Sequence, residues 1–300
     1  MDMKNKIIYL YLFLSTLLFF FPSCTEKELG GCPNLSIHLE YWADGSTDVL
    51  QKHIANATYY IYTEQGKLVQ KGTLSSDLLN RPCGFQLKLD PGKYHFVCWG
   101  NLEHYCLVNR DEQLEQAYIY TAQQDAESYP QSFDPLYFGE ADITITDMDQ
   151  MTKITPHFHG AHVTMWLYVK GFKETDEQGR QIAPHFYLSN FEAEYDFHGL
   201  PRNQQITYYP ESVYKEEDDV LMAYCHLPRF DEQTTSMIHL YSGVDHRLVE
   251  TVDLRKFIDN NNIKLTGKEE VDIPILLEFH DLDCMVTLPD WDEEEAKPIL

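Results

Sequence analysis

The sequence predicts an all-β protein that contains two β-sandwich domains. First, short apolar segments with strand-type alternation recur along the chain and are separated by turn signals. Second, the chain carries 20 Tyr and 16 Phe, residues that favour strands. Third, its 300 residues, 43% of them hydrophobic, give room and apolar surface for about two packed cores.

The chain begins with a targeting segment. Lys4 and Lys6 precede a nearly unbroken apolar run over residues 7–21, which is shorter than the ~20 residues that a membrane-spanning helix needs. The segment ends in Ser23-Cys24 and resembles a bacterial lipoprotein signal, although Phe21 and Pro22 depart from its usual residues. An ordinary signal peptide or a membrane anchor with a chance cysteine is the alternative.

On the lipoprotein interpretation, residues 1–23 are the signal peptide and Cys24 is the lipidation site. Its diacylglyceryl and acyl chains together anchor firmly, whereas one chain alone binds a membrane only marginally. Residues 24–34 then form the lipidated cysteine and its polar tether. Thr25 follows the cysteine in place of the Asp associated with inner-membrane retention, which favours the outer membrane.

The clearest local pattern covers residues 85–101. Phe85, Leu87 and Leu89 alternate with polar residues, as expected of a strand with one buried face. Pro91 and Gly92 fit the central positions of a type II turn, because proline presets φ and glycine supplies a positive φ. Residues 94–99 are almost continuously apolar and predict a strand buried on both faces. The segment therefore predicts a strand–turn–strand unit.

The N-terminal sandwich is predicted over residues 35–149. Residues 112–125 are less regular and partly helical, and the proline-broken residues 129–139 predict a loop packed on the core. The remaining predicted strands cover residues 35–39, 57–62, 68–71 and 141–146.

The C-terminal sandwich is predicted over residues 150–291, followed by an acidic tail at 292–300. The polar junction at 147–153 marks the boundary, and residues 254–260 predict a short helix. Several strands at regular spacing favour a second sandwich. They cover residues 154–169, 185–188, 191–197, 220–227, 236–241, 247–252, 271–279 and 285–288.

Four motifs follow Cys24 in order along the chain. These are C-P-x-L-S-I-x-L-E-Y from Cys32, Y-I-Y-x-x-x-G-K-L-V from Tyr60, L-x-L-D-P-G-x-Y-x-F-V-x-W-G-N from Leu87 and P-L-Y-F-G from Pro135. With Cys24 and these motifs, the sequence resembles the FimB-type fimbrial anchor and accessory lipoproteins of Gram-negative gut and oral bacteria.

The resemblance implies two tandem transthyretin-like β-sandwich domains behind a lipoprotein signal peptide. It also implies an outer-membrane lipoprotein that anchors fimbriae to the cell surface and limits their length, with fimbrial subunits as partners. A sandwich can bind such subunits by β-strand addition, in which an incoming strand pairs with an open sheet edge.

The net charge limits the classes of binding partner, and the cysteines bear on disulfide formation. A net charge of −25 disfavours nucleic acid and anionic membrane surfaces. The six cysteines that remain after Cys24 permit disulfides in an exported protein, and a bridge within the first four of them is one option. Cys98 and Cys225 lie in apolar strands and are expected to be buried small hydrophobes.

The sequence contains no recognisable catalytic motif, so we expect neither an enzyme nor a cofactor. The best metal candidates are His157 and His159, which would share one face of a strand. The interpretation we favour for them is an exposed strand face that happens to carry histidines.

The alternative function is a surface glycan-binding lipoprotein of a polysaccharide-utilisation system. Its sugar-stacking residues would be Trp42, Trp166 and Trp291, although an aromatic residue in such a sandwich is more often part of the core.

Overall fold

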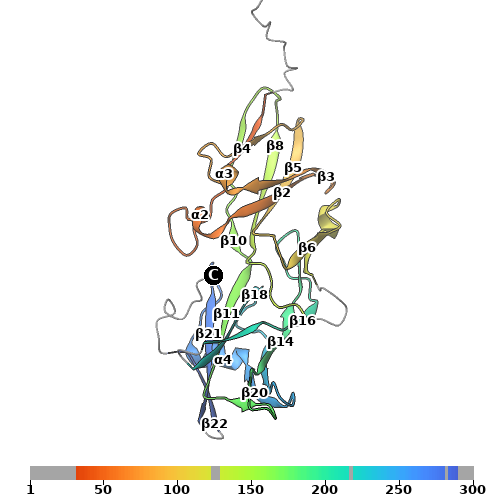
Figure 1. Cartoon of the computed structure of the whole chain (residues 1–300). Coiled ribbons are helices and arrows are strands. Elements are labelled where there is room, and N and C mark those ends of the chain that lie inside the picture. Colours follow the sequence, from red (N-terminus) through yellow and green to blue (C-terminus); the bar gives the residue numbers. More distant parts are fainter. Residues whose placement is uncertain (1–31, 123–128, 216–218, 281–282, 290–300) are drawn as a thin grey trace, which may run out of the picture.

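The computed structural model describes residues 32–122, 129–215, 219–280 and 283–289. Its described part is elongated, with the N-terminal strands at one end and the C-terminal strands at the other (Figure 1). Strands dominate and pack as sandwiches, which confirms the predicted all-β class. Cys24 and Trp291 lie outside the described residues.

The N-terminal sandwich packs a three-stranded sheet against a five-stranded one. Apolar side chains fill the space between them, among them Leu35, Ile37, Tyr59, Phe85 and Phe96. Two short helices, α2 (Leu50–His53) and α3 (Ser76–Leu79), connect strands. The smaller sheet has the order β4 (Phe85–Leu87), β1 (Leu35–Ile37), β9 (Thr152–Ile154). The larger has the order β10 (His159–Gly160), β8 (Tyr137–Ile145), β5 (Gly92–Gly100), β2 (Asn56–Thr63), β3 (Leu68–Ser75).

The five-stranded sheet is covered on its second face as well. A small sheet lies there, with the order β15 (Glu194–Asp196), β7 (Tyr118–Thr121), β6 (Cys106–Asn109), and the 3-10 helix η1 (Leu114–Gln116) precedes β7. Phe197, just after β15, packs on Tyr60 and Trp99, with ring centroids 4.9 Å and 6.3 Å away. The fully buried β5 residues Val97 and Trp99 thus belong to the same core as the second sandwich.

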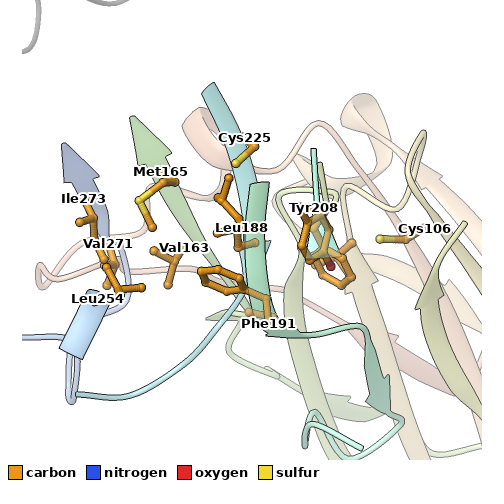
Figure 2. Close-up of a cluster of buried hydrophobic side chains, with 14 of the residues drawn as sticks. Cys106, Val163, Met165, Leu188, Phe191, Tyr208, Cys225, Leu254, Val271 and Ile273 are labelled. Atoms are coloured by element: carbon orange, nitrogen blue, oxygen red, sulfur yellow. The ribbon is translucent and has the colours of Figure 1, made fainter. Parts of the chain in front are cut away.

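The second sandwich has a five-stranded and a four-stranded sheet. Alternate β11 residues Val163 and Met165 point toward Leu188 and Phe191 of β14, as the alternation predicts (Figure 2). One sheet has the order β17 (Ser212–Lys215), β18 (Val220–Pro228), β11 (His162–Lys170), β21 (Asp272–His280), β22 (Asp283–Thr287). The other has the order β16 (Gln205–Tyr208), β14 (His185–Glu192), β19 (Met237–Tyr241), β20 (Leu248–Asp253).

Two smaller elements complete the second sandwich. The strands β12 (Glu174–Thr175) and β13 (Gln181–Ile182) form a two-stranded sheet. Helix α4 (Leu254–Asn261) is capped at its N-terminus by Asp253, whose carboxylate accepts the Lys256 N–H. At its C-terminus the cap residue is Asn262 in the left-handed conformation. The helix predicted at residues 254–260 is thereby confirmed.

The predicted boundary between residues 149 and 150 divides elements that belong together. The strand β9 pairs in parallel with β1, and β10 pairs with β8, so both complete the N-terminal sandwich. In the other direction, β15 pairs with β7 across the predicted boundary. Sheet pairing joins segments far apart in sequence, whereas a change in local composition cannot report it.

The predicted strand–turn–strand unit is also different in the structure. The strand β4 pairs with β1, whereas β5 pairs with β2 and β8, so the turn joins the two facing sheets instead of forming a hairpin. Gly92 is not among the glycines with positive φ and begins β5, which rules out a type II turn. The expected burial of residues 94–99 on both faces is confirmed from Phe96 to Trp99.

The structure corrects or supports three further expectations. Residues 129–139 are not all loop, because β8 begins at Tyr137, whose ring packs in the N-terminal core. Cys98 and Cys225 are fully buried, as expected. The six cysteines of the described residues are all free thiols, so the optional bridge is not formed.

Candidate functional site

A protein that binds another chain by strand addition needs a sheet edge with free backbone groups. Within the described residues, the larger sheets end in β10 and β3, in β17 and β22, and in β16 and β20. These end strands differ in their charged residues, in their exposed side chains and in the loops bonded to them. Such differences affect whether an incoming strand can pair with the edge.

The edge strand β22 (Asp283–Thr287) carries one charged residue, Asp283, at its first position. Met285 is 50% exposed, while Cys284 and Val286 point the other way and pack half-buried on the core. The neighbouring end strand β20 adds Leu248, which is 47% exposed. Burial, and secondly the negative charge of Glu250 on β20, raise the pKa of Cys284 to about 12, so its thiol stays neutral. The ends of the two sheets are therefore close together and form a strip of β22 and β20, in which Met285 and Leu248 are exposed apolar residues and Asp283 and Glu250 are acidic.

The edge strand β3 has two features that oppose pairing with a further strand. Lys71 lies in its middle and forms an ion pair with Asp111 at 2.8 Å. Its first residue, Leu68, donates its backbone N–H to the Glu112 carbonyl at 3.0 Å, so that end is already occupied. Lysines on an edge strand disfavour pairing with a further strand. Within the described residues, β22 has neither a lysine nor a backbone hydrogen bond to a loop of this kind.

A polar network at the junction fixes the two sandwiches relative to one another. Glu270, just before β21, accepts hydrogen bonds from the hydroxyls of Tyr41 and Tyr137 and lies 3.1 Å from Nδ1 of His53. Burial first, and then Glu270 itself, raise the pKa values of both tyrosines, so they remain protonated donors. Arg229 adds hydrogen bonds to the carbonyls of Gly160 and of the loop at 265–269.

The metal candidates His157 and His159 face different carboxylates. Nδ1 of His157 lies 3.7 Å from Glu40, and Nδ1 of His159 lies 2.9 Å from Glu269. The hydrogen bond to Glu269 raises the pKa of His159. Within the described residues, the one cluster of His, Cys, Asp or Glu close enough for a common ion contains neither histidine.

The candidate sugar-stacking tryptophans do not form a platform in the described residues. Trp42 is 46% exposed and meets the ring of His157 edge-on at 4.6 Å. Trp166 is only 6% exposed and packs on Tyr224 within the sheet, so it belongs to the interior and cannot stack on a sugar.

An aromatic patch that the sequence reading missed lies over β14 and β19. Tyr187 contacts the rings of Tyr129, Tyr209 and Tyr241 at centroid distances of 5.7, 4.9 and 5.2 Å. The interplanar angles of 87°, 58° and 80° make it a cluster of tilted rings. The signal for it was present, because Tyr187 and Tyr241 occupy outward positions of strands whose alternate residues are buried.

The predicted lipidation site, Cys24, precedes the first described residue by only eight positions. Asn34 hydrogen-bonds Leu89 and Thr152 at the end of the N-terminal sandwich that lies away from the junction, whereas Tyr41 already contacts Glu270 at the junction. The chain thus enters the fold at the pole opposite the second sandwich (Figure 1). Within the described residues, no helix has the length and hydropathy needed to cross a bilayer.

Comparison with solved structures identifies the class of this fold. The fimbrial anchor protein Mfa2 from Porphyromonas gingivalis superposes with a TM-score of 0.64 at 16% identity, covering 85% of this chain and 95% of that one. A proposed adhesin from Bacteroides ovatus gives a TM-score of 0.67 at 14% identity, with coverage of 86% and 93%. A proposed polysaccharide-binding protein from Bacteroides thetaiotaomicron gives 0.66 at 12% identity, with coverage of 84% and 93%. The chain therefore has the two-sandwich fold of these proteins.

The sequence itself places the chain more narrowly. Residues 29–297 match the family of fimbrillin-A associated anchor proteins Mfa1 and Mfa2, and the chain belongs to that family. No curated protein sequence matches it significantly. The predicted membership of a fimbrial anchor family is thereby confirmed.

Proposed function

We propose that this protein is an outer-membrane lipoprotein that anchors fimbriae to the cell surface and limits their length. The family match over residues 29–297 carries the proposal. The lipoprotein-type segment that ends at Cys24 supplies the membrane attachment, and the sandwiches present the binding surface to fimbrial subunits.

The positions of the chain's entry point and of β22 at opposite ends of the fold support this arrangement. The lipid would attach near the outer pole of the N-terminal sandwich. The strand β21 starts at Asp272 near the junction and runs away from it, so β22 lies in the membrane-distal half of the second sandwich (Figure 1). The strip of β22 and β20 thus faces the side where a fimbrial subunit would approach.

The lipid anchor is tested by Cys24→Ala. We expect a protein that folds normally but is released from the outer membrane, together with fimbriae shed into the medium. The measurement is immunoblotting of membrane and culture fractions, with Cys83→Ala as the control, because Cys83 is an exposed free thiol outside both the signal segment and β22. Retention of Cys24→Ala in the outer membrane would refute lipid anchoring.

We further propose that a fimbrial subunit adds a strand to β22. The test is Met285→Lys, which places a charge on the edge without disturbing the core, because Met285 is half exposed. Val69→Lys on β3 is a matched control, since Val69 is 49% exposed. In a pull-down from solubilised outer membranes, Met285→Lys should lose most of the co-purified fimbrial subunits and Val69→Lys should retain them. Equal recovery with both variants would exclude β22 as the acceptor edge.

The second candidate function is glycan binding at the aromatic patch around Tyr187. Tyr129, at the rim of this patch, is 52% exposed and is accessible to a ligand. Tyr187→Ala should abolish retention on a glycan array if this function holds, whereas wild-type protein that binds no glycan would eliminate it.

A further inference from the structure

A compact group of three potential metal ligands lies where the N-terminal sheet meets the turn after β15. His95 is on β5 and Glu140 on the neighbouring β8. The register pairs His95 with Asp142 and Val97 with Glu140, so His95, Glu140 and Asp142 share one face of the sheet. The third ligand, His198, comes from the turn after β15. The sequence separates these residues widely, and only the fold brings them together.

The turn that carries His198 is held in place by its own neighbours. Asp196 Oδ1 accepts the backbone N–H groups of His198 and Leu200, each at 2.9 Å. Gly199 has a φ of +71°, and a Cβ there would lie 2.6 Å from the Phe138 ring, so the position requires glycine. With the fully buried Phe197 as a further anchor, the His198 backbone is fixed beside the sheet.

The distances fit a shared ion. His95 Nε2 lies 3.1 Å from Glu140 Oε2, and His198 Nδ1 lies 3.8 Å from the same oxygen. One ligand atom from each of the three residues falls within 4.8 Å of the other two. Ligand atoms about 2.0–2.2 Å from a tetrahedral zinc ion are roughly 3.3 Å from one another. Side-chain rotations that move the ligand atoms by about 1 Å would therefore bring all three to the ion.

The outward ring nitrogens provide a second observation. His95 Nδ1 lies 2.9 Å from Asp142 Oδ1, and His198 Nε2 lies 3.3 Å from Glu115 Oε1. Each imidazole therefore turns one nitrogen toward Glu140 and the other toward a separate carboxylate. This carboxylate–histidine arrangement orients metal-binding histidines in proteins.

We propose that His95, Glu140 and His198 bind one zinc ion. Two imidazoles and one carboxylate match the preferences of zinc, whereas calcium and magnesium prefer oxygen-only sites. The three side chains are 20%, 42% and 36% exposed, which leaves the fourth position to water. The ion would tie β5 and β8 to the turn after β15 and so brace the two sandwiches against one another. This proposal is independent of fimbrial anchoring.

Isothermal titration of the detergent-purified full chain with zinc alone tests the site. We expect one zinc per chain. His95→Ala and His198→Gln should each weaken the affinity more than 100-fold, and Asp142→Asn should weaken it about 10–100-fold through the orientation of His95. The matched control is the double variant His157→Ala/His159→Ala, which removes two other histidines and should bind as the wild type does.

A spectroscopic measurement separates a metal ligand from a residue that only supports the fold. Cobalt(II) in place of zinc should give the intense visible absorption of a four-coordinate site in the wild type and in the His157→Ala/His159→Ala control, and should lose it in His198→Gln, while circular dichroism shows all three folded. Zinc binding that is unaffected by His95→Ala and His198→Gln, or that is lost in the control, would overturn the proposal.

Discussion

The carboxylate of Asp134 allows a direct test of what fixes the loop between β5 and β6. Asp134 directly precedes the motif P-L-Y-F-G at residues 135–139 and is only 1% exposed. Its two oxygens accept the backbone N–H groups of four consecutive residues, 103–106, at 2.9–3.2 Å. A buried carboxylate thus organises the whole loop between β5 and β6.

We expect Asp134→Ala to lower the free energy of unfolding by about 3–5 kcal/mol. Each hydrogen bond to a charged group contributes roughly 1.5–3 kcal/mol, which for four bonds would give more than about 6 kcal/mol. The cost is smaller because residues 103–105 are exposed, so their freed amides can reach water. Asp134→Asn should cost about 2–3 kcal/mol, since the amide keeps one acceptor oxygen but turns an NH₂ group toward backbone donors.

Urea unfolding followed by tryptophan fluorescence measures this loss. Asp259→Asn on the exposed side of α4 removes the same charge from the surface and should change stability by less than about 0.5 kcal/mol. If Asp134→Ala also lost less than about 1 kcal/mol, the carboxylate would not organise the loop and the reasoning would be refuted.

Three further perturbations probe the core and its junction. Burial, and secondly the neighbouring His162, lower the pKa of His226 to about 3. Between pH ~6.5 and ~3 the unfolded chain therefore binds more protons than the folded protein, and the stability falls as the pH falls. The urea midpoint of the wild type should drop between pH 7 and 5 more steeply than that of His226→Gln, and equal slopes would contradict this. Phe197→Ala should cost about 3–5 kcal/mol in urea unfolding because the ring is fully buried and packs on Tyr60 and Trp99, whereas Phe197→Leu should cost less than half as much. Gly84→Ala should lower the unfolding temperature markedly, since φ is +66° and a Cβ would lie 2.0 Å from the Ile37 carbonyl oxygen; an unchanged melting temperature would disprove the clash.

Much of the fold could be predicted because strand identity is a local property. The strand predicted at residues 154–169 includes nearly all of β11, whose alternate residues Val163, Met165, Leu167 and Val169 all lie in the core of the second sandwich. The motif order from Cys32 to Pro135, taken together with the lipoprotein-type segment, predicted the fimbrial anchor family. The targeting segment that is predicted to end at Cys24 is likewise a local pattern, and it stays a prediction.

The candidate site depended on information that no local pattern holds. Alternation predicts which face of a strand is buried but not which strand lies beside it, and therefore β4 was placed with β5 although it pairs with β1. For the same reason the end strand β22 could not be distinguished from β3 as an open edge.

The sequence by itself determined the strand-rich class and the family, because these follow from side-chain alternation and short motifs, and it predicts an export signal. The tertiary structure alone decided that β15 crosses to β7, that Phe197 packs on Tyr60 and Trp99, and that His95, Glu140 and His198 meet. These arrangements depend on the packing of whole sheets, where the burial of many apolar side chains selects one set of long-range neighbours.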